Sequence, residues 1–235
     1  MTGLRNVPAC SAWGVLYCYQ QDINKVADLV QVIREVGLTV QSDILWYYAT
    51  GRPQGKCFRK EHEFILYCSK GEPAVFNTDA VRIPYESRDK RHNPKGKSLG
   101  TVWRAPRIMP NYGNYTGHPT QKPTLLSDRM ILASSNVGDT VLVPFAGSGS
   151  EVESAVCLGR NFLACEINDE YIKQCILPRI RRYRMPTVVE NAFTDENASN
   201  TLKELAPRLV GRESKARKEA LDTLSAYRKD NKLIR

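Results

Sequence analysis

A glycine-rich turn joins a short apolar segment to a helix-like segment in VLVPFAGSGSEVESA, residues 141–155. Gly147 and Gly149 lack a Cβ, so the backbone there can approach a ligand closely, next to the start of a helix. Glu166, in LACEIND, follows 17 positions after Gly149 at the end of the next predicted strand. A carboxylate at that place can accept both ribose hydroxyls of a nucleoside cofactor. This pattern predicts a nucleoside site where two strands end.

A structural interpretation of the same residues stays open, in which the glycines only form the turn and Glu166 only caps a helix. The third glycine of a dinucleotide fingerprint is absent, because position 152 is Val. The upstream HPTQKP, residues 118–123, favours the ligand-binding interpretation. There Lys122 stands between two prolines in a stiffened loop, where a cation can meet an anionic group. We expect His118 to be a structural hydrogen-bonding residue of that loop.

The scaffold for these residues is predicted from alternating apolar patterns. Strands are expected at 13–20, 140–145 (buried) and 161–167, a hairpin from 40–49 and 63–68, and helices at 23–36, 125–135, 151–158 and 169–183. Pro178 should kink or split the last helix. Together these elements predict an α/β fold with a doubly wound, Rossmann-like and mostly parallel sheet, a late β-hairpin and a helical C-terminal tail.

Composition limits the class of protein. With 235 residues, 42% hydrophobic and 25% charged, the chain can form one sizeable core over residues 1–184, followed by a charged tail at 185–235. No apolar run is long enough to span a bilayer, so we expect a cytoplasmic protein without a membrane partner. Seven cysteines without a C-x-x-C spacing indicate free thiols and no metal site.

Positive charge is concentrated in two segments of a chain whose net charge is +9. Residues 87–107 hold seven Lys and Arg against one Asp, net +6, and residues 203–235 hold ten against five acids, net +5. Such local excess suits a polyanion, although basic runs are also ordinary solvated faces. We favour the solvated face for the C-terminal run, because acids interleave with its bases.

The order of HPTQKP, a helix, a strand ending in F-x-G-x-G and a strand ending in an acid resembles the cofactor half of the permuted β-type amino-group DNA methyltransferases. Upstream, ILWYYATGRPQGKCFRKEHEFILYCSK is similar to that family's late hairpin, and VWRAPRI is similar to the segment that commonly precedes HPTQKP. The resemblance covers about residues 15–183. It implies methylation of the exocyclic amine of adenine or cytosine in double-stranded DNA, with S-adenosyl-L-methionine as cofactor.

The resemblance also implies roles for individual residues. Those expected to bind the cofactor are Thr120, Lys122, Phe145, Gly147, Gly149 and Glu166. Target recognition would lie in the basic loop at 77–115, which suits phosphate contacts and base-edge readout. The residues expected to contact DNA there are Arg88, Lys90, Arg91, Lys95, Lys97, Trp103 and Arg104.

One part of the family pattern is missing. Its catalytic motif is Asp, Asn or Ser followed by Pro-Pro and an aromatic residue, and none of the thirteen prolines has a proline neighbour. The motif should precede the strand at 13–20, so we expect the chain to begin after it, and the catalytic residue is unknown.

Three hypotheses remain at this point. The first is a DNA amino-methyltransferase, or the cofactor-binding portion of one, whose catalytic strand is supplied by a separate chain or lost from this gene product. The others are a non-catalytic DNA-binding or partner subunit with the same fold, and a nucleotide-dependent oxidoreductase. HPTQKP argues against the oxidoreductase. Homodimer formation or DNA binding through the C-terminal helix also stays open.

Overall fold

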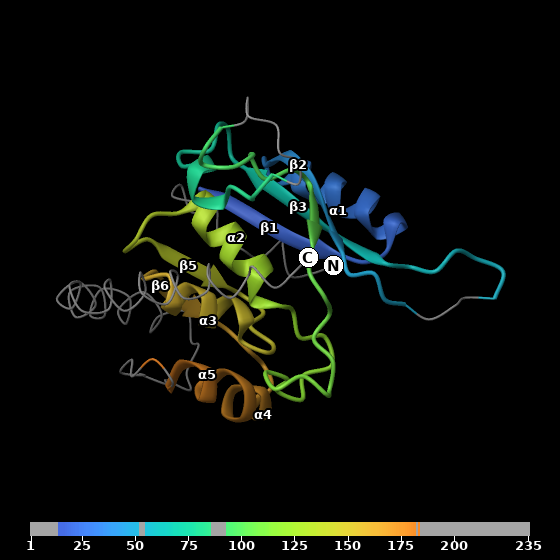
Figure 1. Ribbon diagram of the computed structural model, residues 1–235, viewed down its shortest axis with the longest axis vertical. Coiled ribbons are helices and arrows are strands. Elements are labelled where there is room, and N and C mark those ends of the chain that lie inside the picture. Colours follow the sequence, from blue (N-terminus) through green and yellow to red (C-terminus); the bar gives the residue numbers. More distant parts are fainter. Residues whose placement is uncertain (1–13, 52–54, 86–92, 182, 184–235) are drawn as a thin grey trace. The chain divides into compact units, whose positions relative to one another are not determined.

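The computed structural model describes residues 14–51, 55–85, 93–181 and 183, which form two compact units (Figure 1). Unit 1 consists of the described residues up to Ile108 together with Leu132–Ser135, and unit 2 consists of the other described residues. Unit 1 contains β1 (Val15–Gln20), α1 (Ile23–Glu35), β2 (Thr39–Tyr47), β3 (His62–Ser69), η1 (Thr78–Val81) and β4 (Val102–Arg104). Unit 2 contains β5 (Thr140–Val143), α3 (Ser150–Cys157), β6 (Asn161–Ala164), α4 (Asp169–Tyr171), η2 (Ile172–Ile176) and α5 (Leu177–Arg181). Helix α2 (Thr124–Ser134) belongs to unit 2 up to Ile131 and to unit 1 from Leu132.

The sheet of unit 1 has the strand order β1-β3-β2-β4. Strand β3 is antiparallel to both of its neighbours, and β4 is parallel to β2. The predicted late hairpin is confirmed as β2 and β3, with boundaries within two residues of the expected ones. Its apolar residues occupy the centre of the sheet, where Ile44 pairs with Ile65 and both side chains are buried.

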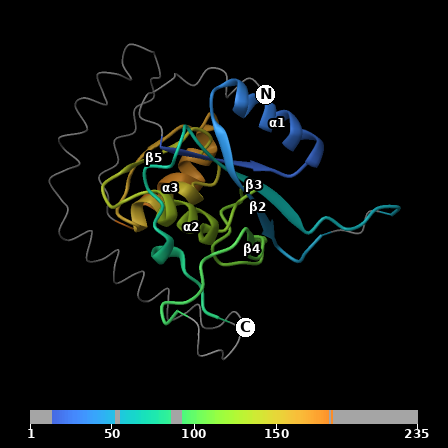
Figure 2. The ribbon, with the colours of Figure 1, turned by 90° about the horizontal axis from the view of Figure 1, so that it is seen from above.

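Helix α1 packs on one face of this sheet (Figure 2). Its N-terminus is capped by Asp22, whose side chain accepts a hydrogen bond from the Asn24 N–H at 3.1 Å. Its apolar stripe ends in Ile33, which is buried against Leu66 and Cys68 of β3. The predicted helix at 23–36 is therefore confirmed.

Strand β4 was not predicted, because the sequence pattern treats 87–107 as a loop. It consists of three residues that alternate between exposed and buried, and such a short run has no readable period. The indole of Trp103 is buried in this strand. Trp46 of β2 fastens the adjoining segment, since its Nε1 donates a hydrogen bond to the Ala105 carbonyl at 2.8 Å.

Unit 2 contains a parallel pair, β5 and β6, with Val143 opposite Ala164 at the carboxyl ends. Helix α3 and the segment from α4 to α5 pack with this pair around one core that includes Val152, Ile176 and Ile180. The predicted strands and the predicted helix between them are confirmed within about three residues at each boundary.

The last predicted helix, 169–183, is interrupted as expected. A turn of α4 leads into the π-helical turn η2, and α5 follows with Pro178 as its second residue. Proline has no N–H to donate to the preceding turn, and a wider helical turn at such a place is a common accommodation.

Two expectations about the sheet are wrong. The sheet of unit 1 is not mostly parallel, because the β2–β3 hairpin places β3 between β1 and β2 and makes both of its pairings antiparallel. Strand β5 is not buried along its length either: Leu142 is 42% exposed, and only Val143 is buried. Within the described residues β5 pairs with β6 alone, which leaves its other edge without a strand.

The described residues contain no helix long and apolar enough to cross a membrane. The described cysteines are free, and no cluster of His, Cys, Asp or Glu suited to a metal ion occurs in the same part of the chain. The predicted tail at 185–235 lies outside the described residues.

Candidate nucleoside-binding site

Glu166 lies beside the glycine-rich turn. One carboxylate oxygen accepts a hydrogen bond from the Gly147 N–H at 2.7 Å, and the other accepts one from the Asn168 N–H at 2.9 Å. The strand pairing explains this position, because the Ala146 N–H continues the ladder beyond β5 by donating to the Cys165 carbonyl at 2.8 Å. Two parallel strands therefore deliver the turn and the carboxylate to the same edge of the sheet, as predicted.

The two glycines of the turn adopt conformations that few other residues tolerate. Gly147 has a φ of 51° and Gly149 a φ of 76°, both in the left-handed region. A Cβ on Gly147 would lie 3.1 Å from the Nε2 of His118, and one on Gly149 would lie 3.1 Å from Ile176. The glycines thus form the turn and also permit close approach of neighbouring groups.

His118 stands against this turn. Its Nδ1 accepts a hydrogen bond from the Thr120 N–H at 3.3 Å, and its ring contacts Tyr171 edge-on with 4.5 Å between ring centroids. Burial lowers the pKa of the His118 imidazole; the Glu166 carboxylate opposes this shift and the Lys122 cation adds to it. The imidazole is therefore harder to protonate than a free histidine side chain.

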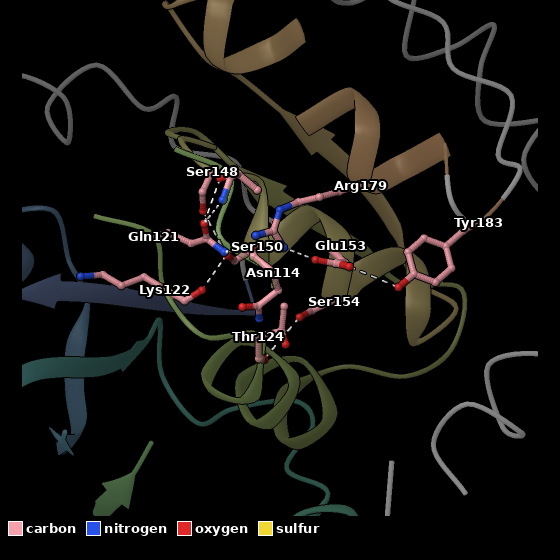
Figure 3. Close-up of polar contacts among 11 residues, drawn as sticks. Asn114, Gln121, Lys122, Thr124, Ser148, Ser150, Glu153, Ser154, Arg179 and Tyr183 are labelled. Atoms are coloured by element: carbon pink, nitrogen blue, oxygen red, sulfur yellow. Dashed lines mark hydrogen bonds and ion pairs between the residues drawn. The ribbon is translucent and has the colours of Figure 1, made fainter. Parts of the chain in front are cut away.

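The HPTQKP loop is held by side chains that the sequence analysis did not single out (Figure 3). Gln121 is buried; its Oε1 accepts from the Thr116 N–H at 2.8 Å, and its Nε2 donates to the Asn114 carbonyl at 2.8 Å. Ser150, the first residue of α3, donates from its hydroxyl to the Lys122 carbonyl at 2.7 Å. The start of α3 thereby fixes the backbone from which the Lys122 side chain extends.

Two large apolar side chains next to the turn are exposed. Phe145 follows the end of β5 and is 79% exposed, whereas Ile167 follows Glu166 and is 101% exposed. Exposed apolar side chains that directly follow β5 and the Glu166 carboxylate in sequence could contact a flat heterocycle held at this edge of the sheet. Ile167 was not predicted as a site residue, although its place directly after the acidic residue was visible in the sequence.

The six residues predicted to bind a cofactor all lie in unit 2. Gly147 is hydrogen-bonded to Glu166, and Thr120 is hydrogen-bonded to His118. It places Gly149 at the N-cap of α3. Asn168, which orients the carboxylate and caps α4, was missed. An Asn before Asp-Glu is an N-cap signal that could have identified it.

Of the residues predicted to contact DNA, four are described, and all four belong to unit 1. Arg88, Lys90 and Arg91 lie outside the described residues. Lys95 is exposed and pairs with Asp79 at 2.6 Å, and together with Arg82 it lowers the pKa of that carboxyl group. Lys97 pairs through its backbone with Ile83, which closes the loop between them.

Arg104 and Trp103 are neighbours on β4 with opposite environments. Arg104 is exposed, whereas the Trp103 indole is buried and donates to the Gly100 carbonyl at 2.8 Å. Trp103 is therefore a core residue here, and we leave it out of the DNA contacts.

The fold and this site define the class as a Rossmann-like methyltransferase. The computed structure resembles the crystal structure of an M1.HpyAVI–SAM complex, with a TM-score of 0.53 and 25% identity over 71% of this chain and 72% of that one. The sequence profile of the N6/N4 DNA methylase family matches residues 10–177. The chain belongs to this family.

Two curated relatives are similar in sequence. The DNA adenine methyltransferase YhdJ of Escherichia coli (strain K12) is 40% identical over 148 residues, which are 57% of this chain and 50% of the relative. The type II methyltransferase M.HpaI of Haemophilus parainfluenzae is 37% identical over 141 residues, 60% of this chain and 45% of the relative. The chain thus spans about half the length of these relatives.

Proposed function

We propose that this chain is the S-adenosyl-L-methionine-binding part of a DNA amino-methyltransferase, which methylates the exocyclic amine of adenine or cytosine. The observation that carries the proposal is the Glu166 carboxylate, held by the amides of Gly147 and Asn168 beside a glycine-rich turn. The relative M1.HpyAVI has been crystallised with SAM, and the relative YhdJ is named a DNA adenine methyltransferase. Adenine is therefore the first base to test.

The residues of unit 2 fit this cofactor. Each Glu166 oxygen accepts one backbone hydrogen bond and retains a lone pair for a ribose hydroxyl. Phe145 and Ile167 offer exposed apolar surface for the adenine ring. Lys122, with Thr120 in the same loop, would bind the carboxylate of the methionine moiety.

The bound cofactor would supply an activated methyl group on a sulfonium. This chain's residues would hold that group in place, so that transfer becomes a matter of proximity and orientation. His118 would support the glycine-rich turn, against which its ring lies.

The group that orients the target amine is not recognisable among the 235 residues, because the sequence has no Pro-Pro pair. We propose that a strand carrying the Asp-Pro-Pro-aromatic motif joins the sheet. Strand β1 pairs with β3 on one edge and with no other described strand, and β5 pairs only with β6. An unpaired edge is a ready site for a further strand from the same polypeptide or from a partner chain.

The experiment is isothermal titration of the chain with S-adenosylmethionine, repeated with Glu166→Gln and Lys122→Ala. Glu170→Gln is the matched control, because this exposed acid lies in the same segment and is not part of the site. The proposal is supported if both site variants lose S-adenosylmethionine binding while the control variant keeps it. It is contradicted if the wild-type chain does not bind S-adenosylmethionine.

Methyl transfer to DNA is then measured with and without a polypeptide that carries the missing motif. Cofactor and DNA binding with no transfer under either condition would favour the non-catalytic alternative. The DNA contacts proposed for the 77–115 loop are tested by substituting Arg88, Lys90 and Arg91 with Ala together, which should weaken DNA binding and flatten its salt dependence.

A further inference from the structure

The connection between β2 and β3 carries an unusual set of side chains at residues 56–60, on the arm that leads into β3. Phe58 is 99% exposed, although an aromatic side chain of this size normally finds apolar cover. Lys56, Arg59 and Lys60 around it are exposed as well. Glu61 is the one acid beside them, and it pairs with Arg59.

The base of this hairpin is firmly anchored in unit 1. The Tyr48 N–H donates to the Glu61 carbonyl at 2.9 Å and extends the ladder of β2 and β3 by one pair. Tyr48 is buried, and the Arg107 guanidinium lies 3.9 Å from its ring centroid while donating to its hydroxyl at 2.8 Å. Arg107 also pairs with Glu63 at 3.2 Å.

The two arms stay in contact beyond this base. A Cβ on Gly51 would lie 2.2 Å from the Lys60 carbonyl oxygen, so the backbones touch at this point. The connection therefore leaves the sheet as a loop whose two arms lie close together at Gly51 and Lys60, and both views show it extending away from the strands of unit 1 (Figures 1 and 2).

We propose that the segment 56–60 of this connection binds duplex DNA, with Phe58 stacking on or between bases and Lys56, Arg59 and Lys60 contacting phosphates. The proposal rests on the proposed function, since a DNA amino-methyltransferase must take its target base out of the stack. Aromatic or apolar wedges compensate for lost stacking, and basic neighbours bind the backbone irrespective of sequence. The excess of positive charge in this segment selects a polyanion over a protein surface.

Fluorescence anisotropy with a fluorescein-labelled duplex of mixed sequence, measured over a series of KCl concentrations, tests the two parts separately. Phe58→Ala should weaken DNA binding about tenfold, which is the effect of losing one base–aromatic stack. The slope of log K against log salt should not change, because no phosphate contact is lost. Substitution of Lys56, Arg59 and Lys60 with Ala should reduce the slope of log K against log salt by about 2.7, or about 0.9 per phosphate contact. Phe58→Trp should restore binding, because it keeps an aromatic face.

Matched controls come from α1 in the same unit. Ile23, 58% exposed, is the apolar control, and exposed Lys25 is the charge control; their Ala variants should bind DNA as the wild type does. Wild-type affinity and slope in the Phe58 and triple variants would overturn the hairpin proposal while leaving the proposed function intact. A wild-type chain that binds S-adenosylmethionine but no DNA would overturn the DNA role as well.

Discussion

The Glu166 carboxylate accepts a hydrogen bond from the backbone N–H of Gly147 at 2.7 Å, across 19 positions of sequence. This contact ties the end of β6 to the turn after β5 and orients the carboxylate before any ligand arrives. Pre-orientation lowers the entropic cost of binding, because neither group must be ordered by the ligand.

Replacing Glu166 with Gln should therefore impair cofactor binding and leave the fold largely intact. One amide oxygen can still accept from a backbone N–H, but the other position becomes a donor that faces the Gly147 or Asn168 N–H. We expect affinity for S-adenosylmethionine to fall by at least about tenfold, since hydrogen bonds to a charged acceptor are worth about 1.5–3 kcal/mol. Isothermal titration measures this, and equal affinity of the variant and the wild type would show that Glu166 does not contact the ligand.

Gly147→Ala should separate backbone strain from steric pressure on His118. An L-residue at a φ of 51° costs about 1–2 kcal/mol, and the new Cβ would press on the imidazole. Gly138→Ala shares the positive φ, 89°, but has no atom within 4 Å of its added Cβ. We expect a larger loss of stability in urea unfolding for Gly147→Ala than for Gly138→Ala, and a loss of cofactor affinity only for Gly147→Ala. An equal loss of affinity in both variants would contradict a role for the His118 contact.

The buried pair Arg179 and Glu153 offers a test of stability in unit 2. Both side chains are largely buried, and Nε and Nη2 of Arg179 have no hydrogen-bond partner among the described residues. Arg179→Met should cost about 3–5 kcal/mol, because it leaves the Glu153 carboxylate buried with the Tyr183 hydroxyl as its one remaining side-chain donor among the described residues. Adding Glu153→Gln should recover most of this loss, as urea unfolding of single and double variants would show. Strictly additive losses would rule out coupling between the two residues.

Prediction from sequence succeeded where local chemistry decides the structure. The apolar runs of the hairpin, the glycines before α3 and Pro178 after η2 all act on their own neighbours, so their positions could be inferred. Strand β4 could not be predicted, because a strand of three residues is determined by its pairing with β2 and not by a pattern in its own sequence. The contact of His118 with Gly147 joins segments far apart in sequence, and only tertiary structure brings them together.

Asp128 of α2 makes the stability of the protein depend on pH. Burial raises the pKa of this carboxyl group from 3.8 to about 6, while a hydrogen bond with Ser154 opposes the shift. In the unfolded chain the group ionises near its ordinary pKa, so between about pH 4 and pH 6 the folded state binds more protons than the unfolded state. This contribution to stability is therefore fully present below the unfolded pKa and is lost as the pH rises through the folded one.

Asp128→Asn removes the titration and keeps a side chain that can hydrogen-bond with Ser154. We expect the variant to be more stable than the wild type by about 3 kcal/mol at pH 7.5, with the difference vanishing near pH 4. Urea unfolding of both proteins across this pH range measures the difference in their free energies of unfolding. Groups other than Asp128 titrate in both proteins, so their contributions cancel in this difference. The exposed Asp28→Asn on α1 serves as the control and should show no such pH-dependent gain. A constant difference between Asp128→Asn and the wild type at all pH values would mean that burial does not perturb this carboxyl group.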